Sequence, residues 1–309
     1  MTSGNPRALA ALCALAAACA HQQLPSLRAT QLIVEKTPRG VRSFVRAKVA
    51  GESIRLLVDT GATRSVLPAS FAQKHRLANA SDAFVEHGID ANGNLLSMQL
   101  LKDVPVQFDG EAGAGRLDFL MNPAEQFSDG ILAPQDLLRS GGALVIDLEH
   151  KELRYEPEAE AIKRPGLAEI EFSRCLKEGF FERSHRFVPT VINGVQTPMM
   201  LDTGASVTLL SRNNPALPSM ARIAGDRGTM TGMTSVGQGL VVNGVPLIFA
   251  KTSYELSVSV SPTSMMCGGG LLGADVLAHC TIVWGYSSLW ADCRPAAPPP
   301  APAPSPSAR

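Results

Sequence analysis

The chain has 309 residues, of which 45% are hydrophobic, and its 28 Lys and Arg residues equal its 28 Asp and Glu residues in number. This length suffices for one large domain or two of ordinary size, and the hydrophobic content supports a buried core. Because there is neither a net charge nor a basic block, nothing would attract nucleic acid electrostatically, and we exclude nucleic-acid binding as a function class.

Residues 1–19 have the features of an export signal, since one arginine precedes a run of Ala and Leu that ends in small residues. A run of about ten apolar residues is short for a membrane span, which favours a cleaved signal. The ending AAAC resembles a bacterial lipobox and predicts Cys19 as the lipidated first residue of the mature chain; plain cleavage near Ala18 or Ala20 is the alternative. We expect a protein of the bacterial cell envelope, either a periplasm-facing lipoprotein held to a membrane only by this anchor, or a secreted protein.

The remainder of the chain contains an internal repeat. Residues 44–68, FVRAKVAGESIRLLVDTGATRSVLP, align without a gap on residues 187–211, FVPTVINGVQTPMMLDTGASVTLLS. A second match follows at nearly the same offset, where DGILAPQDLL (129–138) lies over GGLLGADVL (269–277). This self-similarity predicts two copies of one unit. The predicted segments are an N-terminal copy at 30–157, a connector at 158–171, a C-terminal copy at 172–294 and a Pro/Ala tail at 295–309 that is disordered or polyproline-like.

Each copy reads as mostly β-structure. Apolar and charged residues alternate over 45–49, which predicts a strand with one buried face. The alternation is lost over 54–58, as expected of a strand buried on both faces. Helical pattern is scarce and is confined to short segments such as 70–78 and 133–140. The sequence therefore predicts an all-β fold.

In each copy the apolar strand ends in Asp-Thr-Gly-Ala, at 59–62 and at 202–205. The glycine permits a tight turn whose backbone N–H groups approach the carboxylate, and the threonine hydroxyl can bond to the backbone of the other copy. If a pseudo-twofold axis relates the copies, Asp59 and Asp202 meet at the axis, and one of them holds a proton near neutral pH. The ionised member can then take a proton from a water molecule while the protonated member polarises a carbonyl. This chemistry predicts attack of water on an amide without a covalent intermediate.

The segments LLVDTGATRSVLP and MMLDTGASVTLLS resemble the active-site strands of aspartic proteases, in particular the retropepsin-like type, and GGLLGADVL resembles the second signature of that family. The resemblance implies an all-β, bilobed, pepsin-like fold of two retropepsin-like repeats, in which one monomeric chain supplies both catalytic aspartates, Asp59 and Asp202. It implies an aspartic endopeptidase with a peptide or protein substrate and no cofactor. The residues it assigns to active-site support are Thr60, Gly61, Ala62, Thr203, Gly204 and Ala205. The residues it assigns to two substrate-covering flaps are Gly88, Ile89, Asp90, Gly232, Met233 and Thr234.

The sequence departs from the family pattern in three ways. Ala133 stands where the second signature has glycine, so its methyl group would crowd the turn that carries Asp59. Neither predicted flap contains a tyrosine. Ala62 and Ala205 lack the hydroxyl that pepsins use to hydrogen-bond the aspartates, so the pair should titrate at higher pH and the enzyme should prefer weakly acidic to neutral pH. The alternative function is an exported, catalytically silent peptide-binding protein of the same fold.

Four cysteines follow Cys13 and Cys19, and an even number in an exported chain indicates two disulfides. A hairpin that turns at 285–288 places Cys280 opposite Cys293, which leaves Cys175 with Cys267, although three connectivities are formally possible. The cysteine spacing predicts no metal site. The six histidines are scattered, and we expect them on the surface or in packing positions.

Overall fold

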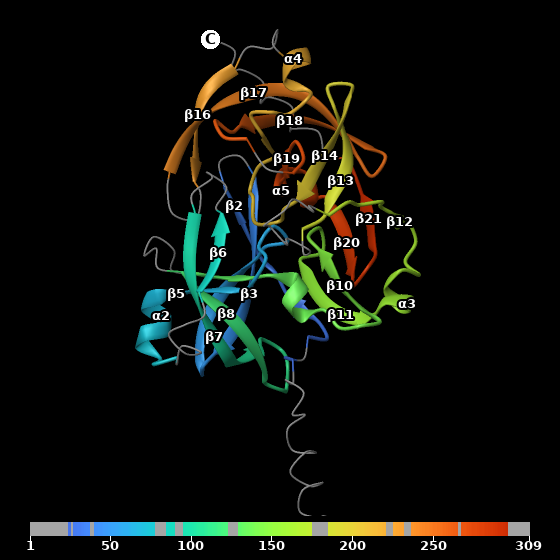
Figure 1. Cartoon of the computed structure of the whole chain (residues 1–309). Coiled ribbons are helices and arrows are strands. Elements are labelled where there is room, and N and C mark those ends of the chain that lie inside the picture. The colour runs from blue at the N-terminus through green and yellow to red at the C-terminus, as the bar shows by residue number, and fades with distance from the viewer. Residues whose placement is uncertain are drawn as a thin grey trace, which may run out of the picture.

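The structure is a computed structural model that describes residues 24–25, 27–37, 40–77, 85–89, 95–122, 129–174, 185–220, 225–231, 236–264 and 267–295. Strands account for most of the secondary structure, and the few helices are short, so the all-β prediction is confirmed. Figure 1 shows the strands of the first half at the bottom, those of the second half at the top, and a group of strands from both halves at one side.

The first half forms an eight-stranded sheet in the order β2-β3-β4-β9-β5-β8-β7-β6. Its strands are β2 (Ile33–Lys36), β3 (Val41–Val49), β4 (Glu52–Val58), β5 (Val66–Pro68), β6 (Val85–Ile89), β7 (Leu95–Phe108), β8 (Gly115–Asn122) and β9 (Gly130–Leu132). Its helices are α2 (Ala69–Lys74) and the 3₁₀ helix η1 (Pro134–Leu137). The two short helices predicted in this half are therefore present, but each is shorter than its sequence pattern.

The second half forms a seven-stranded sheet in the order β13-β14-β19-β15-β18-β17-β16. Its strands are β13 (Phe187–Ile192), β14 (Val195–Leu201), β15 (Leu209–Leu210), β16 (Gly225–Thr231), β17 (Val236–Phe249), β18 (Thr252–Val260) and β19 (Gly270–Leu272), and its helices are α4 (Leu217–Met220) and α5 (Ala274–Leu277). β14 pairs in parallel with β19, as β4 pairs with β9 in the first half. In both halves, the strand that leads into Asp-Thr-Gly-Ala thus lies beside the strand of the second signature.

A third sheet draws strands from both halves, in the order β1-β11-β10-β20-β21-β12. Its strands are β1 (Thr30–Gln31), β10 (Gly142–Asp147), β11 (Glu152–Pro157), β12 (Ala168–Glu169), β20 (Cys280–Gly285) and β21 (Leu289–Cys293), and α3 (Glu158–Ala161) lies between β11 and β12. β10 pairs with β20, with Val145 opposite Val283, and both side chains are fully buried. The predicted connector, 158–171, contains α3 and β12. This shared sheet joins the halves through backbone hydrogen bonds and a continuous core.

The burial of the strands before the first aspartate agrees only in part with the sequence pattern. In β3 the apolar residues Val45, Ala47 and Val49 are fully buried and alternate with exposed charged residues, as predicted. The expectation that 54–58 is buried on both faces is wrong, because Arg55 and its neighbours on one face of β4 keep partial exposure. The guanidinium of Arg55 forms an ion pair with Asp129 at 2.7 Å, and a charged pair of this kind stays near water.

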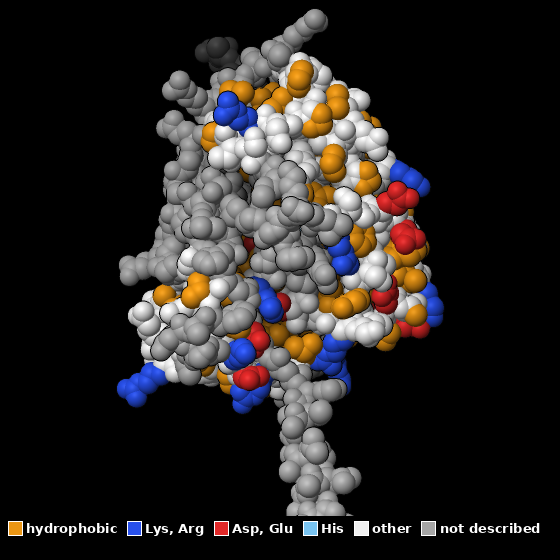
Figure 2. All heavy atoms as spheres, viewed as in Figure 1, with side chains coloured by type: hydrophobic (Ala, Val, Ile, Leu, Met, Phe, Trp, Pro, Cys, Tyr) orange, Lys and Arg blue, Asp and Glu red, His pale blue; other side chains and the backbone are white. Residues whose placement is uncertain are grey.

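The hairpin of β20 and β21 has the predicted register, and a disulfide joins Cys280 to Cys293. Cys267 is also disulfide-bonded, and its expected partner, Cys175, lies outside the described residues. Cys19 likewise lies outside them. Within the described part of the chain, no helix is long and apolar enough to cross a membrane. On the face shown in Figure 2, acidic and basic side chains lie interspersed, in keeping with the balanced charge.

Candidate active site

The fold brings Asp59 and Asp202 together. Each aspartate directly follows the last residue of its strand, β4 or β14, and its N–H donates across to the second-signature strand of the same half. These two bonds, from Asp59 to the carbonyl of Leu132 and from Asp202 to the carbonyl of Leu272, are both 3.0 Å long. Each carboxyl group lies against the turn glycine of the other half, and the negative charge of Asp202 acts on Asp59. Two residues that lie far apart in the chain therefore form one carboxyl pair, and the backbone hydrogen bond that holds each of them is the same in both halves.

The backbone of each turn holds its own carboxylate. Asp59 Oδ1 accepts hydrogen bonds from the N–H groups of Gly61 at 2.8 Å and Ala62 at 3.0 Å. Asp202 Oδ1 accepts equivalent bonds from the N–H groups of Gly204 and Ala205, both at 2.9 Å. A Cβ at Gly61 would lie 2.6 Å from Cγ of Asp202, and one at Gly204 would lie 2.6 Å from Oδ1 of Asp59. Glycine is therefore required by the closeness of the opposite carboxylate.

The two threonines lock the turns to each other through reciprocal hydrogen bonds. Thr60 Oγ1 donates to the carbonyl of Leu201 at 2.9 Å and accepts from the N–H of Thr203 at 3.0 Å. Thr203 Oγ1 donates to the carbonyl of Val58 at 2.7 Å and accepts from the N–H of Thr60 at 3.1 Å. Both threonines are buried. This exchange ties each turn to the strand that carries the opposite aspartate and keeps the two carboxyl groups in register.

Burial raises the pKa of both carboxyl groups of the pair. The pKa of Asp59 is raised well above its usual value, first by burial and then by the negative charge of Asp202. Burial also raises the pKa of Asp202, against the opposing effects of the turn N–H groups, the bond to Asp59 and the charge of His185. Two buried carboxyl groups this close cannot both ionise cheaply, so the shift favours a state in which the pair keeps one proton. A pair with one proton can act as base and acid together.

The comparison with protein families agrees with this geometry. A family model described as aspartyl protease matches residues 45–133, which run from β3 through the first Asp-Thr-Gly-Ala turn to the end of the second signature. This part of the chain is therefore similar to the aspartyl protease family. The match covers the first of the two repeats. The sequence has no significant match among the curated proteins.

A second pair of aspartates, which were not predicted from the sequence, supports the two turns. Asp136 Oδ2 accepts from the N–H of Ser65 at 2.7 Å, and Asp275 Oδ2 accepts from the N–H of Thr208 at 2.8 Å. Burial raises the pKa of both carboxyl groups. A signal for them was present, because each aspartate follows the second signature and each hydroxyl residue lies six positions after a catalytic-motif aspartate.

The expected crowding at Ala133 does not displace the first turn. Its methyl group is fully buried, its N–H donates to Ser65 Oγ at 3.0 Å, and its backbone is extended, with φ −83°. A Cβ at the equivalent Gly273 would instead collide with the backbone of Val207. The first half contains one extra residue, Pro134, directly after the alanine. This different path leaves room for the methyl group, and the bonds from the two aspartates to their neighbouring strands remain equal in length.

The predicted flaps fall at the ends of two hairpins. β6 pairs with β7 up to Ile89 opposite Leu95, and β16 pairs with β17 up to Thr231 opposite Val236. Gly88 lies within β6. The remaining flap candidates, namely Asp90, Gly232, Met233 and Thr234, lie outside the described residues, so their role stays a prediction.

One histidine lies next to the first catalytic-motif turn. His185 is buried beside the carboxyl pair, and its Nε2 lies 2.6 Å from the carbonyl oxygen of Gly61. Its burial agrees with the expected packing position, and its place beside the carboxyl pair is what the structure adds. No pattern in the sequence could identify it, since its partner lies in the other half of the chain.

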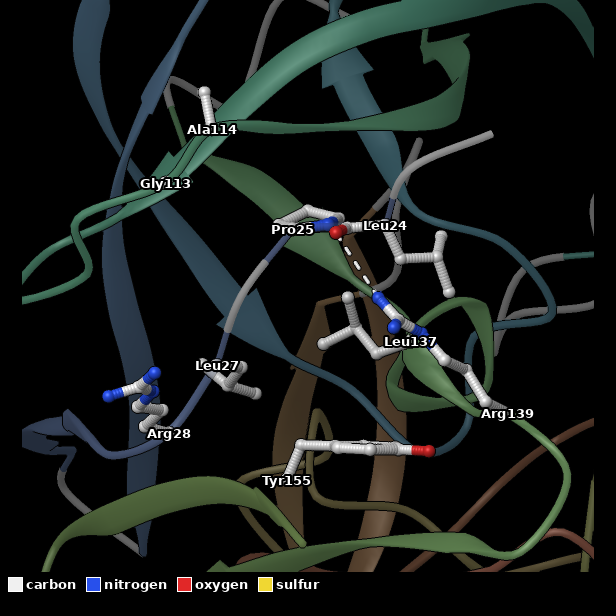
Figure 3. Close-up of a pocket in the computed structure, with 9 residues that line it drawn as sticks. All are labelled: Leu24, Pro25, Leu27, Arg28, Gly113, Ala114, Leu137, Arg139 and Tyr155. Carbon is white, nitrogen blue, oxygen red and sulfur yellow. Dashed lines mark hydrogen bonds between the residues drawn. The ribbon is translucent and has the colours of Figure 1, made fainter. Parts of the chain in front are cut away.

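A cavity of about 290 Å³ lies elsewhere in the first half, between the segment before β1 and residues near β8 and β11. Figure 3 shows that Arg139 donates to the carbonyl of Leu24 beside the ring of Tyr155, and none of the lining residues belongs to a catalytic turn. This cavity is therefore separate from the candidate active site. Among the residues that the structure describes, no group of three or more His, Cys, Asp and Glu side chains could hold a metal ion.

Proposed function

We propose that the protein is an aspartic endopeptidase that hydrolyses peptide bonds with a water molecule activated between Asp59 and Asp202. The observation that carries the proposal is the close approach of each carboxyl group to the opposite turn, held by the reciprocal hydrogen bonds of the two threonines. The ionised member takes a proton from the water, whose oxygen attacks the substrate carbonyl carbon. The protonated member donates its hydrogen bond to the carbonyl oxygen, and the amine leaves with a proton from the pair. The enzyme forms no covalent bond to the substrate.

The family-model match in the first half and the matched strand pairings of the two halves support this proposal, and the pairings also support a pseudo-twofold relation between the repeats. The test is digestion of a peptide library by the wild type and by Asp202→Asn, with and without a statine-type inhibitor. We expect wild-type cleavage that the inhibitor blocks and that the variant lacks. Asp147→Asn is the matched control, because Asp147 and Asp202 are equally buried, at 7% exposed each, and Asp147 lies outside the site. A wild type that binds peptides without cleaving them would favour the silent peptide-binding alternative.

We further propose that the mature chain is an exported lipoprotein that acts as a monomer on peptide or protein substrates. The apolar segment ending at Cys19 and the disulfide between Cys280 and Cys293 support export, because disulfides persist in oxidising compartments. Mass spectrometry of the N-terminal peptide, with Cys19→Ala as control, tests the lipid. A wild-type mature N-terminus without an acyl group would refute it.

A further inference from the structure

His185 connects the second half of the chain to the first catalytic turn. It lies two residues before the start of β13, and only 5% of it is exposed. Its Nε2 lies 2.6 Å from the carbonyl oxygen of Gly61. A carbonyl oxygen only accepts hydrogen bonds, so Nε2 is the donor. The histidine therefore fixes the first turn from the opposite half.

The peptide group between Gly61 and Ala62, which accepts this bond, also donates a hydrogen bond to Asp59. The carbonyl of Gly61 and the N–H of Ala62 belong to the same planar unit. That N–H donates to Asp59 Oδ1 at 3.0 Å. A continuous chain of hydrogen bonds thus runs from the imidazole through one peptide group to the carboxyl group. Hydrogen bonds in such a chain polarise one another, which strengthens the contact to Asp59.

The charge of the imidazole acts on the other member of the pair. Protonated His185 lowers the pKa of Asp202 and so opposes the effect of burial. Arg186, the next residue, points into the shared sheet, where its guanidinium lies 4.0 Å from the ring centroid of Trp284. It also donates to the carbonyls of Gly285 and Ser288, so the backbone that carries His185 is anchored. Among the charged groups near the imidazole are Asp202, on which its charge acts, and Arg186, the next residue in the chain.

The two halves differ at this position. The residue that aligns with His185 in the first repeat is Arg42, whose Nε is buried without a hydrogen-bond partner in the described structure. Arginine stays charged at all relevant pH values, whereas histidine changes its charge between about pH 5 and 8. At this aligned position the second half therefore has a group of variable charge where the first half has a fixed one.

We propose that His185 is a positioning residue of the candidate catalytic pair: it holds the first turn through Gly61 and, when protonated, favours the singly charged state of the pair at acidic pH. This inference rests on the proposed endopeptidase function. If His185 has this role, the contact between His185 in the second half and the turn in the first half sets the lowest pH at which the enzyme is active.

The test is the pH profile of kcat/KM for His185→Gln, measured with the best peptide from the library digestion. Glutamine keeps an N–H donor for Gly61 but carries no charge, so we expect the acidic limb of the profile to move up by about half a pH unit or more. The control is His75→Gln, because His75 pairs with Glu52 on the outside of the first half and should leave the profile unchanged. Coincident acidic limbs for the wild type and His185→Gln would overturn the proposal.

A second measurement separates this inference from the proposed function and does not need activity. The ring signals of His185 are titrated by NMR in the wild type and in Asp202→Asn. If the imidazole contacts the pair, loss of the Asp202 charge destabilises the protonated ring and moves its titration midpoint to lower pH. The reason is linkage: if protonated His185 stabilises the charge of Asp202, that charge stabilises protonated His185 equally. An unchanged midpoint would overturn the role of His185 even in an active enzyme. A wild type without peptidase activity but with the shifted midpoint would refute only the endopeptidase function.

Discussion

Replacing Thr203 by valine tests the lock between the two turns. Valine has nearly the same shape but no hydroxyl, so the change removes two hydrogen bonds and leaves no cavity. It leaves the N–H of Thr60 and the carbonyl of Val58 without partners in a buried site. An unsatisfied buried group costs about 1–3 kcal/mol, so we expect the free energy of unfolding to fall by about 2–6 kcal/mol. Since the lock also keeps the carboxyl groups in register, kcat/KM should fall at least about tenfold.

Urea unfolding followed by tryptophan fluorescence measures the stability, and Thr190→Val is the matched control. Thr190 is equally buried, but its hydroxyl makes one bond, to the carbonyl of Thr197 at 2.7 Å within one sheet. This control should lose about 1–3 kcal/mol and keep its activity. If Thr203→Val lost no more stability than Thr190→Val and kept full activity, the reciprocal bonds would not be what holds the pair together.

Three further outcomes are expected. Gly204→Ala places a Cβ 2.6 Å from Oδ1 of Asp59, so a carboxyl group must move by about 1 Å and kcat/KM should fall about 100-fold, whereas Gly113→Ala, in open space, should have no effect. Because the pKa of Asp59 is raised, the singly protonated pair persists to higher pH, and kcat/KM should peak at weakly acidic to neutral pH; a maximum below about pH 3 would contradict this. Replacing Cys280 and Cys293 by alanine opens a loop with a sequence separation of 13 and should cost about 3 kcal/mol in a denaturation curve, while an unchanged midpoint would show that the bridge does not stabilise the fold.

Much of the site could be predicted because its chemistry is carried by short, contiguous motifs. The strand ending in Asp-Thr-Gly-Ala occurs twice, and this repetition predicts two equivalent turns that meet if a pseudo-twofold axis relates the copies. The register of the last hairpin followed from residue spacing, since opposite positions in a two-stranded hairpin are set by the turn. Local pattern failed where a charged side chain found a partner elsewhere, as Arg55 did with Asp129. It also could not foresee that one inserted residue would make room for Ala133.

The sequence by itself determined the repeat, the all-β class and the two aspartates, because these depend on periodicity and on residues adjacent in the chain. Only the tertiary structure decided what surrounds the pair: the closeness that demands Gly61 and Gly204, the buried supports Asp136 and Asp275, and the imidazole of His185. The reason is that each of these contacts joins groups from separate segments. Their distances, and therefore their effects on charge and protonation, arise only when the segments pack together.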